Sequence, residues 1–160
     1  NGFNVDLFSY LFGSVSAVGR TDLWVISIIS VIVVFTVIFL YKELFLLSFD
    51  EEHAKTSGIP AKAIHFIFIV LVALVIAISM RIVGVLLVSA LMTLPVAAAL
   101  KVAKSFKQTI FMSILFGEIA VVGGLFTAYY LNLAPGGTIV VLAILVLLVT
   151  ILFKKWQVNR

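Results

Sequence analysis

The chain has 160 residues, of which 64% are hydrophobic and only 11% are charged. Because a soluble globular domain contains about 25% charged residues, this chain has too few polar side chains to cover a surface in water. It contains no cysteine, which excludes a disulfide framework and thiolate metal ligation. The formal net charge is +4. We expect an integral membrane protein without a soluble catalytic domain, and with no nucleic-acid partner.

Residues 1–20 predict a short element on the outer side. Its apolar residues fall on one helical face: Phe8, Leu11, Phe12 and Val15. Gly13 interrupts the pattern, and the stretch is too short to span a bilayer, which takes at least about 17 residues. We expect an outer or re-entrant helix, because irregular backbone at membrane depth must be packed in protein.

Five apolar stretches follow, each predicted to cross the membrane. They must be helices, because lipid cannot satisfy backbone polar groups. They are 23–41, 63–80, 82–100, 109–130 and 138–153. A single helix across the second and third would be about 57 Å long, so we place a tight turn at 79–84. The predicted fold is an all-α polytopic membrane protein, with residues 1–160 in a single transmembrane domain.

The basic residues predict the orientation. Alternating spans place segments 42–62, 101–108 and 154–160 on one side of the membrane. That side holds nine basic residues: Lys42, Lys55, Lys62, Lys101, Lys104, Lys107, Lys154, Lys155 and Arg160. The other side holds Arg20 and Arg81. The positive-inside rule therefore makes the first side cytoplasmic, and it accounts for the basic charge without an anionic ligand.

The cytoplasmic loop 42–62 predicts a short helix outside the membrane. Ser48 and Glu51 have the S-x-x-E spacing of a capping box. Gly58 can take the left-handed conformation that ends a helix, and Pro60 prevents its continuation. We therefore expect a helix over residues 49–57. Composition alone favours a plain surface helix for this stretch.

Four segments, in this order, resemble the permease subunits of ABC transporters that import zinc, manganese or iron(II). They are YLFGSVSAV at 10–18, SFDEEHAKTSGI at 48–59, VGVLLVSALMTLPVAAAL at 83–100 and APGGTIV at 134–140. The layout is similar, more distantly, to permeases for cobalamin and iron-siderophores. Such permeases are usually longer, so we take the chain as the C-terminal part of one. Their N-terminal helices, which hold His and Asp near the metal route, have no counterpart here.

The resemblance implies that the loop helix is a coupling helix that docks into a partner ATPase. Four positions match the family pattern: Phe49, Asp50, Ala54 and Gly58. The implied partners are an ABC ATPase subunit that uses ATP, an extracytoplasmic metal-binding protein, a second permease copy and the lipid of the bacterial inner membrane. The cargo is a divalent ion (Zn²⁺, Mn²⁺ or Fe²⁺), and the chain itself needs no cofactor. It has no GxxxxGK[ST] loop, so we expect it not to be an enzyme.

Glu118 lies near the middle of the stretch 109–130. A carboxylate at mid-span costs about 2.5–3.5 kcal/mol on insertion scales and is a functional candidate for that reason. Oxygen ligands suit Mn²⁺ and Zn²⁺, so Glu118 is a candidate for the metal route. The alternative is a structural glutamate that is protonated or paired with another helix.

Several other residues are informative. Pro95 lies inside the third span and is predicted to kink it; the resemblance implies that this segment borders the translocation path. Ala120, Gly124 and Ala128 form a small-xxx-small pattern, which favours close packing inside the molecule over a dimer face. The remaining polar candidates are His53 and His65, which lack helical metal-pair spacing and are not expected to be transport ligands, and Asp6 and Asp22, which lie on the outer side.

Two other classes of function remain open from the residues alone. An ion-coupled secondary transporter or channel would need several membrane carboxylates or an inverted repeat. A membrane-embedded enzyme would need paired acids, a Ser/His pair or HExxH within its spans. Glu118 is the only carboxylate in the predicted spans, and neither pattern is seen in this sequence. The N-terminal helices of the longer permease could hold such sites.

Overall fold

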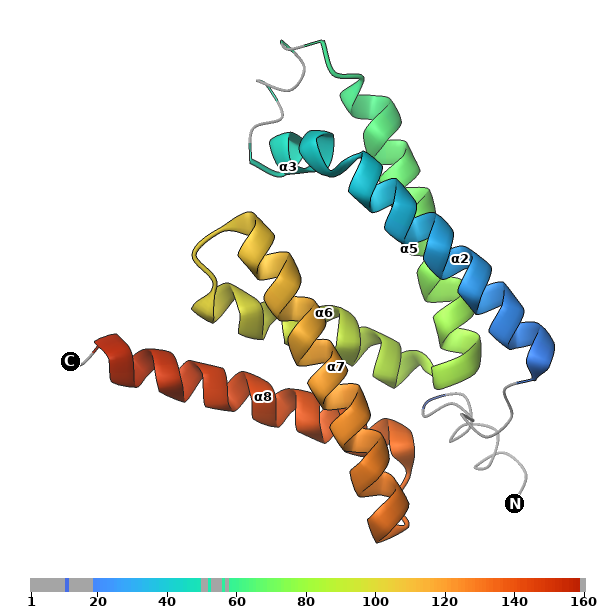
Figure 1. The fold of residues 1–160 in the computed structure, drawn as a ribbon, viewed down its shortest axis with the longest axis vertical. Coiled ribbons are helices and arrows are strands. Elements are labelled where there is room, and N and C mark those ends of the chain that lie inside the picture. The colour runs from blue at the N-terminus through green and yellow to red at the C-terminus, as the bar shows by residue number, and fades with distance from the viewer. Residues whose placement is uncertain (1–10, 12–18, 50–51, 53–55, 57, 159–160) are drawn as a thin grey trace. The chain divides into compact units, whose positions relative to one another are not determined.

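The computed structural model describes residues 11, 19–49, 52, 56 and 58–158 (Figure 1). The helices in this part of the chain are α2 (Arg20–Phe39), α3 (Tyr41–Phe49), α5 (Ala61–Val83), α6 (Val85–Val102), α7 (Phe106–Leu131) and α8 (Pro135–Val158). All of them except α3 are long and apolar enough to cross a membrane. The chain is thus an all-α, multi-pass membrane protein, as its composition predicted.

The five predicted spans correspond to α2, α5, α6, α7 and α8, with ends that differ by a few residues. Local capping explains some of the differences. Helix α7 begins before the predicted residue 109 because the Ser105 side chain accepts a hydrogen bond from the backbone N–H of Gln108 at 3.3 Å. Helix α8 begins at Pro135, since proline suits the first position of a helix, where no backbone donor is needed.

The break between α5 and α6 falls at Gly84. Its φ is +84°, in the left-handed region that a side chain disfavours. The Gly84 N–H still donates to the Met80 carbonyl at 3.1 Å, and Arg81 lies in the last turn of α5. The predicted turn within 79–84 is confirmed, and it lies at the end of that range.

The helices fall into two compact units, one within Ala17–Ser79 and one formed mainly by Met80–Arg160. In the second unit, α6, α7 and α8 each pack against the other two. Most of its buried residues are small: Gly84, Ala98, Ala99, Ala120, Gly124, Ala128, Gly136 and Ala143. Because lipid is as apolar as a hydrophobic side chain, helices associate in it through close van der Waals packing, which small residues allow.

Helices α7 and α8 approach each other closely at Gly124. A Cβ atom placed there would lie 2.5 Å from Ile139 Cγ1 and 2.7 Å from Ile139 Cα. Beside this contact, the Thr138 hydroxyl donates to the Gly124 carbonyl at 3.1 Å. Ala120 and Ala128, one turn on either side, are also buried. The small-xxx-small pattern therefore packs against another helix of the same chain, as predicted.

We expect Gly124→Ala to destabilise the full-length protein by about 1–3 kcal/mol, the usual cost of overpacking. The matched control is Gly123→Ala, because a Cβ at Gly123 meets only Leu142 Cδ1, at an ordinary 3.5 Å. The measurement is the thermal unfolding midpoint of the two purified variants in detergent. Equal midpoints would show that α7 and α8 are not in close contact at Gly124.

The orientation is tested at the two ends of α7. Lys104 precedes the helix and Leu133 follows it, and both are exposed. In a cysteine-free background, we expect Leu133→Cys to react with a membrane-impermeant thiol reagent added to intact cells. Lys104→Cys should react only after the cells are opened. Labelling of Lys104→Cys from outside would reverse the predicted topology.

Candidate functional site

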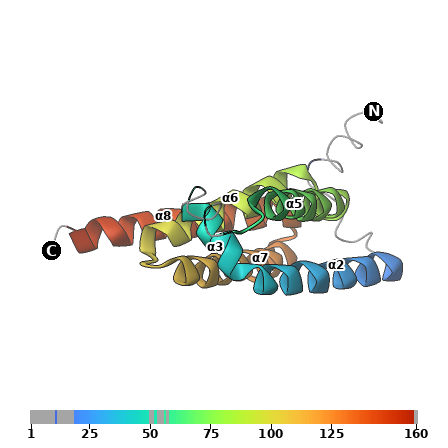
Figure 2. The ribbon, with the colours of Figure 1, turned by 90° about the horizontal axis from the view of Figure 1, so that it is seen from above.

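The chain bends where α2 meets α3. Leu40, between the two helices, has φ −92° and ψ 15°, and α3 leaves the axis of α2 in both views (Figures 1 and 2). Two backbone hydrogen bonds are kept at the bend: the Leu40 N–H donates to the Thr36 carbonyl and the Leu44 N–H donates to the Leu40 carbonyl, each at 2.9 Å. This change of direction at Leu40 is called the elbow below.

The expected helix start at Ser48 is wrong. Ser48 lies inside α3, and its hydroxyl donates to the Leu44 carbonyl at 2.7 Å, as serines within helices commonly do. The S-x-x-E spacing misleads here because a helix is already present before Ser48. The expected cap partner Glu51, together with Asp50, His53 and Ala54, lies outside the described residues.

The end of the predicted loop helix agrees with expectation. The Thr56 hydroxyl donates to the Glu52 carbonyl at 3.2 Å, which is the i to i−4 spacing of a helical turn. Gly58 has φ +80°, the left-handed conformation predicted for it. Pro60 lies just before α5 and accepts from the Ile64 N–H at 3.1 Å. Below, residues 49–58 are called the docking segment, after the ATPase docking that the resemblance implies for them.

The docking segment begins with an exposed aromatic side chain. Phe49 is 70% exposed, and its ring centroid lies 4.9 Å from that of Phe45, one turn earlier on α3. Phe45 is also exposed. Two neighbouring rings at the end of a helix offer an apolar surface, and aromatic side chains of this kind are typical anchors of protein–protein interfaces.

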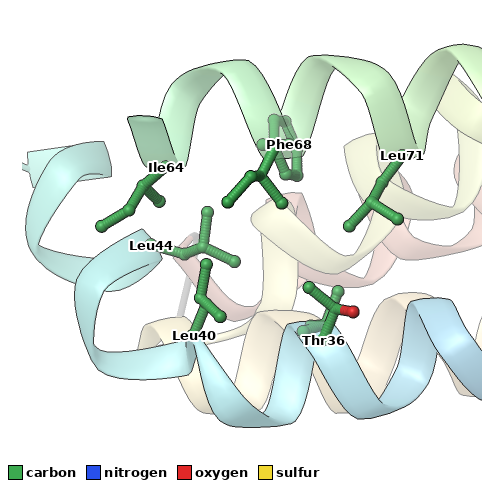
Figure 3. Close-up of a pocket in the computed structure, with 8 residues that line it drawn as sticks. Thr36, Leu40, Leu44, Ile64, Phe68 and Leu71 are labelled. Carbon is green, nitrogen blue, oxygen red and sulfur yellow. The ribbon is translucent and has the colours of Figure 1, made fainter. Parts of the chain in front are cut away.

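An apolar cleft lies between the elbow and the start of α5 (Figure 3). Its volume is only about 10 Å³, and it is lined by Thr36, Val37, Leu40, Leu44, Ile64, Ile67, Phe68 and Leu71. A space of this size with almost no polar lining does not suit a metal ion or a substrate. The cleft is therefore a small apolar gap between the elbow and α5, and not a ligand site.

Glu43 is a residue that the sequence analysis did not single out. It lies in the first turn of α3, and its Oε2 atom is buried without a hydrogen-bond partner. Leaving such an oxygen unpaired is costly, so it warrants an explanation. A carboxylate directly after a predicted span was the available signal, and the adjacent Lys42 made it look like part of an ordinary charged loop.

Glu118 lies on α7 with its side chain exposed. Its neighbour Gly117 faces Pro95 of α6, because a Cβ at Gly117 would lie 3.9 Å from Pro95 Cγ. Pro95 is buried, and α6 continues through it; the predicted kink stays a prediction. Glu118 is thus the next residue in the chain after a contact between α6 and α7.

In the part of the chain that the structure describes, Glu118 is not part of a metal site. Among the described residues, no group of three or more His, Asp or Glu side chains is placed to hold a metal ion. Asp22 instead caps α2, where its Oδ2 accepts from the Gly19 N–H at 3.1 Å. His65 is exposed on α5. Asp6 lies outside the described residues.

Comparisons with known proteins agree on one family. The model of the ABC 3 transport family matches residues 1–154. A probable metal transport system membrane protein of Treponema pallidum is 40% identical over 97% of this chain and 58% of its own length. The manganese transport system membrane protein MntC of Listeria monocytogenes is 33% identical over 96% of this chain and 55% of its own length.

Two further comparisons extend this result. The high-affinity zinc uptake system membrane protein ZnuB of Haemophilus influenzae is 34% identical over 94% of this chain and 58% of its own length. The solved structure of PsaBC from Streptococcus pneumoniae in complex with Fab matches with a TM-score of 0.84 and 37% identity, over 92% of this chain and 53% of that one. The chain therefore spans somewhat more than half the length of these relatives.

Proposed function

Because this chain belongs to the ABC 3 transport family, we propose that it forms part of the permease of an ATP-driven importer of divalent metal ions, Mn²⁺ or Zn²⁺. Relatives that align with nearly all of it are named for manganese transport and for zinc uptake. The exposed aromatic end of α3 carries the proposal within the structure, because it offers a partner a docking surface outside the apolar spans.

In this proposal the energy comes from a separate subunit. The chain has no phosphate-binding GxxxxGK[ST] loop, so an ABC ATPase would bind and hydrolyse ATP. An extracytoplasmic metal-binding protein would deliver the ion, and a second permease copy would complete the pathway. ATP binding would favour one of two permease conformations, so transport is a shift of population between outward-open and inward-open states.

The docking segment would receive the ATPase. Phe49 serves as the apolar anchor, with Phe45 supporting its ring from the preceding turn. Gly58 ends the segment in a conformation that returns the chain to α5. Asp50 and Ala54 belong to the proposed contact through their match to the family pattern. Ala54 would lie close enough to the ATPase that only a small side chain is tolerated.

Glu118 would contribute to the cation route. Its carboxylate is exposed on α7, so it is available to a permeating ion or to a further helix. Because Pro95 of α6 lies next to Gly117, this part of α6 lies beside the residue that precedes Glu118. Intramembrane carboxylates commonly mark ion pathways, because their burial cost must be offset by a partner or a cation.

We expect Phe49→Ala to lose the ATPase during purification of the complex while inserting normally. Removal of an interface anchor costs at least about 2 kcal/mol, or more than about tenfold in affinity. The matched control is Phe39→Ala on α2, which removes a ring that is 76% exposed. Co-purification of the ATPase with each full-length variant is the measurement. Equal ATPase retention by both would refute docking through Phe49.

We expect Glu118→Gln to reduce metal uptake about tenfold or more while leaving ATPase retention unchanged. The substitution keeps the side-chain volume and removes the charge, and a contact with a charged group contributes about 1.5–3 kcal/mol. Uptake is measured in cells with matched protein levels, and Glu118→Asp serves as the variant that keeps the charge. If Glu118→Gln transports at the parental rate, Glu118 is structural.

A further inference from the structure

Burial in the unit Ala17–Ser79 is concentrated at one place. Among the described residues of α2 and α3 none is buried. On α5 the buried residues are Ala61 and Ile64, each 6% exposed, and both lie in the first turns of the helix. Among the described residues of this unit, the strongest burial thus lies in the first turns of α5.

The side chain of Ile64 lines the cleft on the side opposite the elbow. Figure 3 shows Ile64 and Phe68 of α5 on one side of the cleft, with Leu40 and Leu44 facing them from the other. The Thr36 hydroxyl, the polar group among the lining side chains, donates to the Ile32 carbonyl at 2.7 Å. The apolar space between them is only about 10 Å³, which leaves these side chains little room to shift independently.

The docking segment has a point of backbone freedom on each side. Leu40 interrupts the helical path before it, and Gly58 takes a positive φ after it. If backbone alone connected these parts, a displacement of the segment would be absorbed by rotation at Leu40 and Gly58. Leu44 of α3 and Ile64 of α5 line the cleft from opposite sides, so packing of these side chains across it would oppose that rotation.

We propose that Leu40, Leu44, Ile64 and Phe68 form a coupling cluster, which makes α2 and α5 move together when the docking segment is displaced. Its members are positioning residues, since none is expected to touch the ATPase or the metal ion. The inference rests on the proposed docking of the ATPase at residues 49–58. Packed apolar contacts of this kind switch between discrete arrangements and do not deform continuously, so they transmit displacement.

The test is Ile64→Ala in the full-length permease, reconstituted with its ATPase and its metal-binding protein. The expected result is normal retention of the ATPase together with loss of coupling. Metal transported per ATP hydrolysed should fall by at least about fivefold, the lower end of typical coupling factors. Basal ATP hydrolysis should continue, and its stimulation by the loaded binding protein should be lost.

The matched control is Ile69→Ala, which makes the same truncation on the same helix at a side chain that is 56% exposed. Ile64→Val, which keeps the branched shape, should restore most of the coupling. Leu44→Ala removes the facing side of the contact and should lower the coupling ratio as Ile64→Ala does. Combining the two should add little, because both remove one contact.

The outcomes separate this inference from the proposed function. Unchanged transport per ATP in both Ile64→Ala and Leu44→Ala would overturn the coupling cluster and leave docking at Phe49 intact. Should Ile64→Ala fail to accumulate, Leu44→Ala and Ile64→Val decide the matter by the same ratio. If Ile69→Ala lowers the transport per ATP as much as Ile64→Ala does, the coupling cluster is also overturned. Truncation of an exposed side chain on α5 would then be enough to lower the coupling.

Discussion

The close approach of α7 to α8 at Gly124 sets the geometry on which the rest of the Met80–Arg160 unit depends. In lipid there is no hydrophobic driving force between helices. Their association therefore depends on how closely their backbones can approach. Gly124 removes the Cβ that would collide with Ile139, and the Thr138 hydroxyl adds a hydrogen bond across the contact. With this pair fixed, α6 packs against both helices, and Pro95 meets Gly117 beside Glu118.

The kind of contact between the helices inside each unit differs from one unit to the other. In the Met80–Arg160 unit the buried residues are mainly alanine and glycine, which gives close and rigid backbone packing. In the Ala17–Ser79 unit, large apolar side chains, such as Leu44 and the buried Ile64, line a small cleft from its two sides. Leucine and isoleucine have several rotamers available, so packing around this cleft can rearrange more easily than the small-residue contacts of the other unit.

The spans were predictable because each is a long apolar stretch that is unfavourable in water. In lipid, such a stretch must pair its own backbone polar groups, and a helix does so. Their ends were less predictable, since local partners such as Ser105 determine them. Ser48 was misread because its spacing to Glu51 carries no information about the helix that already precedes it. The cleft that Leu44 and Ile64 line brings together residues that are distant in sequence, and no local pattern reports it. Glu118 could be singled out from the sequence because a charge in an apolar stretch is conspicuous, and its role stays a prediction.

Helix α5 is the element through which the two parts of the proposed mechanism connect along the chain. It begins at Ala61, three residues before Ile64 of the coupling cluster, and its last residues, from Met80 to Val83, belong to the other unit. Its 23 residues make a rod of about 35 Å, and a helix of continuous hydrogen bonds changes length very little. At the end of this rod, the positive φ of Gly84 lets the chain change direction into α6. If the docking segment receives an ATPase as proposed, the covalent chain through α5 and Gly84 is the route by which its displacement would reach α6, where Pro95 contacts Gly117 next to Glu118.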